Sequence, residues 1–149
     1  MKLKIPPPLW TLLTALTMWL LAHIAPDAFS LPSASWLAAI IAVAGGLITA
    51  AGARALSQAK TTLSPHHPDQ TTQIVRHGIL RFSRNPMYLG MALFLTAWAI
   101  FLGHMLAWLG VVGFIWIITV LQIQPEERLL AEKFGADYAD YCRQTRRWL

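Results

Sequence analysis

Four apolar segments divide the chain, and each has about the length of a membrane-spanning helix. They cover residues 9–25, 35–53, 86–102 and 106–123, and none of them contains Asp, Glu, Lys or Arg. A bilayer core about 30 Å thick requires roughly 20 helical residues, with a range of about 17 to 25. The pattern therefore predicts an all-α polytopic membrane protein with four transmembrane helices, a cytoplasmic loop and a helical C-terminal tail.

Composition supports a membrane location. Hydrophobic residues make up 56% of the 149 residues and charged residues only 13%, whereas soluble domains carry about 25% charged residues. At this length we expect residues 1–149 to form one integral membrane domain. The single cysteine, Cys142, excludes an internal disulfide.

The charges predict the topology. All 12 Lys and Arg residues lie before the first segment, between the second and third, or after the fourth. Asp27 and His104 are the only charged or titratable residues in the two remaining connections. The positive-inside rule then places both termini in the cytoplasm. The net charge of +5 is thus explained by topology and contact with anionic lipid rather than by nucleic acid.

Three local features shape the expected bundle. Gly45 and Gly46 would let another helix approach closely. Only residues 103–105 separate the last two segments, which predicts a tight helical hairpin. A cleavable signal peptide is the alternative for the first segment, but the segment is long for one and Pro26 follows the candidate cleavage site.

The cytoplasmic loop, residues 57–85, is longer than a simple helix connection, for which about 2 to 8 residues are usual. Asn85 is a favourable N-cap residue and Pro86 suits the first helical position. A helix N-terminus attracts anions, and Arg84 adds a charge that pairs well with carboxylate or phosphate. The alternative is an ordinary capped helix with an interfacial arginine.

The tail after residue 122 carries two adjacent carboxylates, Glu126 and Glu127. Pro125 is expected to open a new helix, whose positive end the two carboxylates favour. Gly135 is expected to divide the tail into two helices. An apolar stripe would lie on the membrane or cover the bundle, and it consists of Leu130, Phe134, Tyr138 and Tyr141. Carboxylates here could bind an amine, a ribose diol or a cation, or simply form a solvated helix start.

The histidines do not predict a metal site. His66, His67 and His77 share one loop without paired ligand spacing, and Cys142 is distant in the sequence. A structural zinc site usually requires four N or S ligands.

Two motifs in this order are distinctive. Arg84-Asn85-Pro86-Met87-Tyr88-Leu89-Gly90 opens the third apolar segment, and Pro125-Glu126-Glu127-Arg128 follows the fourth, with Tyr138, Tyr141 and Arg146-Arg147-Trp148 behind it. Over roughly residues 61–149 the chain resembles the isoprenylcysteine carboxyl methyltransferase family and its bacterial relatives, within a wider phospholipid methyltransferase-like group.

The resemblance implies an S-adenosylmethionine-dependent methyltransferase in a bacterial inner membrane, acting on a lipophilic or lipidated acceptor. The implied cofactor-binding residues are Arg84, Asn85, Pro86, Tyr88, Gly90, Glu126, Glu127, Tyr138 and Tyr141. Arg84 would meet the methionine carboxylate, a carboxylate would meet the ammonium or ribose, and Gly90 would let a flat ligand approach. Arg84 and Glu127 are the candidate catalytic residues, and no general base is identified.

Departures from the family leave the acceptor open. Asn85 replaces a histidine of the eukaryotic enzymes, Gly78-Ile79-Leu80 replaces a Gly-Pro-Tyr of bacterial relatives, and Gln122-Ile123-Gln124 replaces basic residues of the prenyl-protein enzymes. An isoprenylcysteine-type carboxylate is the first expectation, with phospholipid, amine or thiol acceptors as alternatives. Outside the methyltransferases, a nicotinamide-dependent membrane reductase and a small four-helix exporter have a similar helical layout. The oligomeric state is not indicated.

Overall fold

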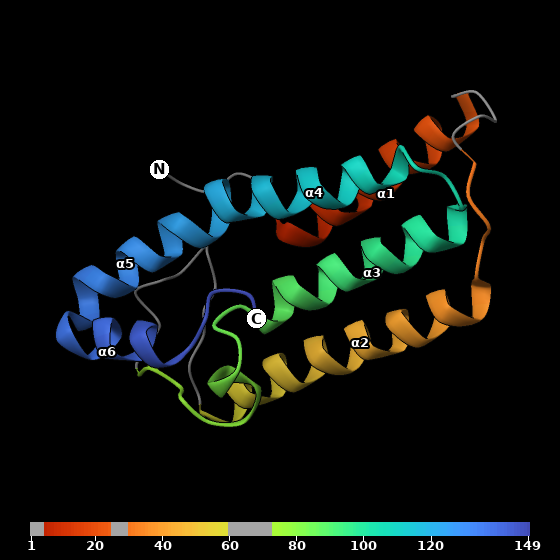
Figure 1. Cartoon of the computed structure of the whole chain (residues 1–149). Helices are drawn as coiled ribbons and strands as arrows, with labels where there is room; N and C mark the ends of the chain where they lie inside the picture. The colour runs from red at the N-terminus through yellow and green to blue at the C-terminus, as the bar shows by residue number, and fades with distance from the viewer. Residues whose placement is uncertain (1–4, 25–29, 60–72) are drawn as a thin grey trace.

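The computed structural model describes residues 5–24, 30–59 and 73–149, and in these the secondary structure is helical apart from two isolated β-bridges. Figure 1 shows the arrangement. In chain order the elements are α1 (Pro7–Ile24), α2 (Ser35–Gln58), the 3-10 helix η3 (Gly78–Arg81), α3 (Pro86–Leu102), α4 (Ala107–Ile118), the π-helical turn η4 (Thr119–Ile123), α5 (Gln124–Phe134) and α6 (Ala136–Gln144). The predicted all-α class is confirmed.

Three of the described helices are long and apolar enough to cross a membrane: α1, α2 and the continuous helix Ala107–Phe134. The fourth expected span, α3, is an apolar helix of 17 residues, slightly shorter than these. Its role as a full span therefore stays a prediction. The third and fourth segments do form the expected hairpin, because Gly103 ends α3 in the left-handed conformation and α4 begins at Ala107.

The expectation that Pro125 starts a separate helix is wrong. α4 continues through η4 into α5 without a break, as Figure 1 shows for the long helix that projects beyond the bundle. Pro125 has no amide hydrogen and cannot make the regular α-helical bond to the preceding turn. The wider π-helical turn lies directly before it, and such turns often occur at functional sites.

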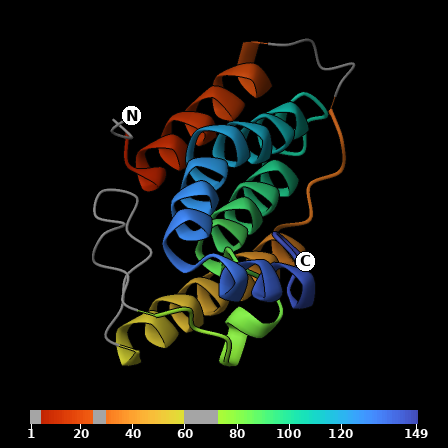
Figure 2. The same ribbon diagram turned by 90° about the vertical axis from the view of Figure 1, so that its left-hand side faces the viewer.

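Helix α3 lies at the centre of the bundle. It packs along α2 on one side and contacts α1 and α4 on the other, and α1 also packs against α4. Figure 2 shows these helices from the end. Trp98 of α3 donates a hydrogen bond from its Nε1 to the carbonyl oxygen of Ala15 in α1, at 3.1 Å, which ties the first helix to the centre.

Glycines set the spacing between α2 and α3. A Cβ atom added to Gly45 would lie 2.9 Å from the carbonyl oxygen of Gly90, and one added to Gly90 would overlap the hydroxyl of Thr49. Gly46, in contrast, would make only an ordinary contact with Phe94 at 3.6 Å. Of the expected glycine pair, Gly45 therefore carries the close approach. Gly90 lies against Gly45 and Thr49 of α2. The expectation that a flat ligand lies beside Gly90 is therefore wrong, because α2 occupies that space.

The elements that the sequence predicts to be cytoplasmic lie together at one end of the bundle. α5, α6, η3 and the C-terminus lie there, and residues 30–34 before α2 and the turn between α3 and α4 lie at the other end (Figure 1). At that other end the amide of Leu31 donates to the carbonyl oxygen of Gly103 at 2.6 Å, and His104 is buried. This separation is consistent with one cytoplasmic face, while the orientation itself stays a prediction.

Candidate functional site

The C-terminal residues lie against the segment that precedes α3. Ser83 and Arg146 form a parallel β-bridge, and the amide of Arg84 donates to the carbonyl oxygen of Arg146 at 3.0 Å. Asn85 occupies the expected N-cap position, but its side chain makes no cap. Its Nδ2 instead donates to the carbonyl oxygen of Arg147 at 2.9 Å. Asn85 thus holds the tail against the start of α3.

Helix α6 packs against the rest of the protein through its two tyrosines. Tyr138 and Tyr141 are buried, and the hydroxyl of Tyr141 donates to the carbonyl oxygen of Leu80 in η3 at 2.7 Å. Burial raises the pKa of Tyr141 to about 12, so this donor keeps its proton at physiological pH. The tyrosines of the predicted apolar stripe therefore belong to a tail that covers the protein.

An ion-paired cluster joins the two sequence motifs. Glu127 accepts hydrogen bonds from Nη2 of Arg84 at 2.8 Å and from Nη2 and Nε of Arg147 at 2.7 and 3.0 Å. The side chains of Arg84 and Glu127 are only 11% and 17% exposed. Burial alone would raise the pKa of Glu127, but the hydrogen bonds from the two arginines outweigh it and lower that pKa. Glu127 is therefore ionised near neutral pH.

Arg84 is not the free cation that the sequence suggested. Besides the pair with Glu127, its Nη1 donates to the carbonyl oxygens of Cys142 and Thr145. Its Nε is buried, and no described residue accepts a hydrogen bond from it. The other donors of this guanidinium fix Glu127 and the tail.

Glu126 has a different environment from its neighbour. Its Oε1 accepts a hydrogen bond from the hydroxyl of Tyr88 at 2.6 Å, and no described arginine or lysine forms an ion pair with it. The residue belongs to α5, beyond the apolar part of the long helix that ends at Ile123. Burial is the main cause that raises the pKa of Glu126 to about 8. The hydrogen bond from Tyr88 lowers this pKa, and the negative charge of Glu127 raises it further.

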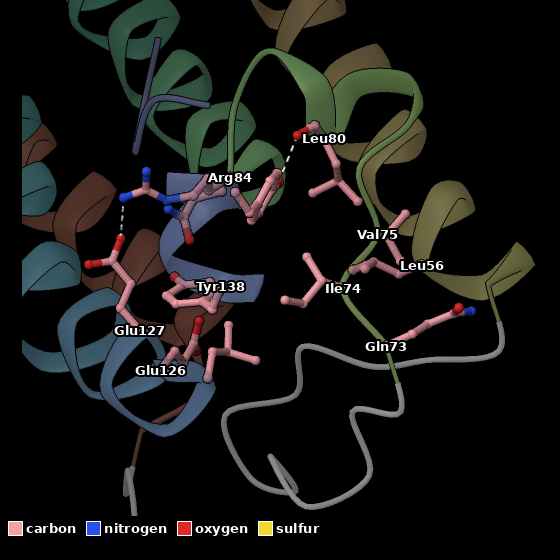
Figure 3. A pocket seen from close by; sticks show the side chains of 12 residues that line it. Leu56, Gln73, Ile74, Val75, Leu80, Arg84, Glu126, Glu127 and Tyr138 are labelled. Atoms are coloured by element: carbon pink, nitrogen blue, oxygen red, sulfur yellow. Dashed lines mark hydrogen bonds and ion pairs between the residues drawn. The ribbon is translucent and has the colours of Figure 1, made fainter. Parts of the chain in front are cut away.

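The two carboxylates are therefore not a solvated helix start. Glu126 and Glu127 of α5 are half-buried, and Figure 3 shows Glu127 next to Arg84 and Glu126 next to Tyr138. Pairs of titratable groups whose environments push their pKa values apart are typical of sites that perform acid–base chemistry. Here the pair consists of one carboxylate fixed in its charged form and one whose proton is exchangeable near neutral pH.

Two hollows meet at this cluster. The first, here called the enclosed cavity, has a volume of about 30 Å³ and lies between α5, α6, η3 and the end of α2 (Figure 3). Its walls include Leu56, Val75, Leu80, Arg84, Glu126 and Tyr138. The second, here called the open groove, has a volume of about 420 Å³, and its walls include Gln124, Arg128, Gly135, Tyr138, Cys142 and Arg147. Glu127 and Tyr138 line both hollows.

Most of the residues that the resemblance named come together, but two lie apart from the hollows. The cluster contains Arg84, Asn85, Tyr88, Glu126, Glu127, Tyr138 and Tyr141. Pro86 instead packs against α2, where a Cβ atom on Gly52 would lie 2.8 Å from its Cγ, and Gly90 faces α2 one turn further on. The sequence analysis did not predict that Arg147 pairs with Glu127. The Arg146-Arg147-Trp148 ending was the one sequence feature that could have indicated it.

The histidines give no metal site in the part of the chain that is described, where no group of three or more potential ligands occurs. His66 and His67 lie outside the described residues. The predicted absence of a metal site is therefore untested in that loop.

Comparisons with known proteins identify the family. A family model described as phospholipid methyltransferase matches residues 33–137, which is well over half of the chain. An uncharacterized protein of Haemophilus influenzae is 51% identical over 63 residues, which are 42% of this chain and 100% of that protein. No solved structure matches the chain. The expected resemblance is thus confirmed for the wider group and not for the isoprenylcysteine enzymes in particular: the chain belongs to the phospholipid methyltransferase family.

Proposed function

We propose that this protein transfers a methyl group from S-adenosylmethionine to an acceptor that carries a lipid tail, at the cytoplasmic face of a bacterial inner membrane. The observation that carries the proposal is the convergence of Arg84 and Tyr88, at the start of α3, with Glu126 and Glu127 of α5. These charged and polar groups lie where the apolar helices give way to more polar segments. The family match supports the reaction type.

The residues around the open groove fit the donor. Its volume of about 420 Å³ lies within the range of about 300 to 1,000 Å³ for small-molecule sites, whereas the enclosed cavity has room for little more than one or two water molecules. Arg147 can pair with a carboxylate, Glu127 with an ammonium group or a ribose diol, and Tyr138 can pack against a flat base. When bound, S-adenosylmethionine supplies an electrophilic methyl group on a sulfonium.

The protein's own contribution is mainly alignment. Arg84 fixes Glu127 through a charge-assisted hydrogen bond, and Asn85 fixes the backbone at Arg147. These contacts hold the walls of the donor site before the ligand arrives, which reduces the ordering that binding requires. Holding the two reactants in line and excluding water account for a large part of the rate enhancement in such transfers.

An acceptor with a lipid tail fits the position of the site at the end of the helix bundle. On α3, Phe94 and Phe101 are 41% and 52% exposed, so they present aromatic surface toward lipid, whereas Met91 and Trp98 pack against the core. The apolar surface of α3 is therefore divided between helix packing and contact with lipid. A tail that runs beside Phe94 would bring its head group toward the cytoplasmic end.

The test is a series of acceptors with one reactive head and tails of increasing length, assayed with the protein in liposomes. Each methylene moved from water into the membrane contributes about 0.8 kcal/mol, or roughly fourfold in partitioning, so turnover at a fixed total concentration should rise with tail length until the acceptor is fully bound to the membrane. Equal turnover for all tails at a fixed total concentration, with water-soluble acceptors methylated equally well, would contradict the lipid-borne acceptor and indicate a small cytosolic substrate.

A further inference from the structure

We propose that the π-helical turn η4 is a positioning element: its one extra residue rotates Glu126 and Glu127 of α5 from the outer side of the long helix toward the site. The inference rests on the proposed methyltransferase function for its donor readout, and it goes beyond that function by naming what aims the carboxylates. It starts from the side of the long helix that faces the protein, before and after the turn.

The protein-facing side of α4 follows a regular α-helical spacing. Its buried residues are Ala107, Val111, Phe114 and Ile118. An α-helix has about 3.6 residues per turn and therefore rotates by about 100° per residue. If α4 continued as a regular α-helix, the next positions on this side would be 122, 125 and 129.

A regular helix would point Glu127 away from the site. Glu127 comes nine residues after Ile118, so it would lie about 180° from Ile118 around the helix axis. Glu126 comes eight residues after Ile118 and would lie about 80° from it. Glu127 would then be on the outer side of the helix, where Leu109 and Trp116 of α4 are exposed.

The structure has a different protein-facing side beyond the turn. Ile123 is buried and Leu129 is exposed, although a regular helix would turn Ile123 outward and Leu129 inward. Glu126 and Leu130 instead line the enclosed cavity. The protein-facing positions have therefore moved from 125 and 129 to 126 and 130, which is a shift of one residue.

The π-helical turn accounts for this shift. The amide of Gln124 donates to the carbonyl oxygen of Thr119, five residues back, whereas α-helical bonds span four residues. One more residue is therefore held within a single turn. The helix beyond the turn keeps the direction that a regular helix would have if it were one residue shorter.

Pro125 opposes the regular alternative. Its ring and its missing amide hydrogen are incompatible with an α-helical bond to the carbonyl oxygen of Leu121, four residues back. Rotation of Glu127 to the outer side would also leave Arg84 largely buried and without its carboxylate. The proline and the ion pair therefore favour the same helix geometry.

Gln122 fixes the turn within the protein. Its side chain is buried, and its Nε2 donates to the carbonyl oxygen of Ile5, which precedes α1, at 3.0 Å. Burial of an amide is unfavourable unless the amide is hydrogen-bonded, so this contact stabilises one position of the turn. The turn is thus held by the segment before α1 on one side and by the ion-paired cluster of α5 on the other.

The experiment changes the number of residues in the turn. Leu121, which is exposed, is deleted from a Pro125→Ala protein, in which a regular helix is allowed. The matched control inserts one alanine after Leu121 in the same Pro125→Ala protein. Deletion removes the extra residue, so a regular helix keeps Glu126 and Glu127 on the site, whereas insertion rotates them by about 100°.

The first readout is donor affinity, measured by calorimetric titration with S-adenosylmethionine. The deletion variant should bind within about threefold of the wild type. The insertion variant should lose roughly ten- to a hundredfold in affinity, because Glu127 no longer faces Arg84 and the donor. Pro125→Ala alone should stay close to the wild type, since the ion pairs of Glu127 still favour the turn.

The second readout, cysteine labelling, reports the rotation of α5 without the donor. Leu129→Cys or Leu130→Cys is introduced in a Cys142→Ser background, and the rate of reaction with a maleimide is measured. In the wild type and the deletion variant, position 129 should react faster than position 130, because Leu129 is exposed and Leu130 lines the enclosed cavity. In the insertion variant the order should reverse.

Two results would overturn the proposal. The first is a deletion variant that does not melt cooperatively, binds the donor at least about tenfold more weakly or reverses the labelling order. The second is an insertion variant that keeps both the affinity and the labelling order of the wild type, since the length of the turn would then not set the direction of α5. Failure of the wild type to bind the donor would remove the proposed function, while the labelling order would still test the turn.

Discussion

Replacing Glu127 by Gln is expected to lower both stability and donor affinity more than any other single change in the site. The substitution keeps the shape of the side chain but leaves Arg84 and Arg147 without their shared carboxylate. Removing one partner of a largely buried ion pair costs about 3 kcal/mol or more. Loss of a charge-assisted contact to the donor costs about 1.5 to 3 kcal/mol, which is roughly ten- to a hundredfold in affinity.

The measurements are thermal unfolding in detergent and calorimetric titration with S-adenosylmethionine. Glu132→Gln, exposed on the same helix, removes the same charge without an ion pair in the site and should change neither quantity. Ion pairing holds the pKa of Glu127 below its ordinary range, so its contribution to stability is present above about pH 4.3 and is lost as pH falls. Unchanged melting temperature and affinity in Glu127→Gln would contradict the assignment of this cluster.

The second large effect is expected from Gly90→Ala. The added methyl group would lie 2.6 Å from the carbonyl oxygen of Gly45 and would overlap the hydroxyl of Thr49. Since the backbone of α2 cannot move aside without disturbing the whole helix pair, overpacking should cost about 1 to 3 kcal/mol. The melting temperature in detergent should fall, and the donor site should weaken as the start of α3 shifts.

Gly113→Ala is the matched control, because nothing lies within 4 Å of a Cβ atom added to Gly113 in α4. Alanine is favoured over glycine in a helix by about 1 kcal/mol, so this variant should be as stable as the wild type or more stable. If both variants behaved alike, the close contact between α2 and α3 would not be the reason for a glycine at position 90.

Helix positions were largely predictable from the sequence, and the reasons are physical. The start of α3 at Pro86 and the break at Gly135 follow from backbone restrictions of proline and glycine, which act locally. The continuous helix through Pro125 did not follow, because the compensation lies in the π-helical turn before it. Whether a proline begins a helix or lies inside a continuous one depends on how the surrounding elements pack. A short stretch of sequence does not reveal that packing.

The sequence predicted most of the residues that form the site, but not which of them form ion pairs with one another. The sequence indicated that Arg84 and the Glu126–Glu127 pair belong together, yet it offered no reason to assign Arg147 to Glu127 and to leave Glu126 without a cation. These assignments depend on the fold of the tail, in which the backbone at Arg146 and Arg147 lies against the start of α3. Gly90 was predicted to be a place of close approach, but the approaching element is α2.

The most direct test of the central claim is a calorimetric titration of the purified, detergent-solubilised protein with S-adenosylmethionine. A parallel titration uses reduced nicotinamide adenine dinucleotide phosphate. The account predicts saturable binding of S-adenosylmethionine that weakens ten- to a hundredfold in Glu127→Gln, and no binding of the nicotinamide. Binding of the nicotinamide without binding of S-adenosylmethionine would contradict the account and favour a membrane reductase.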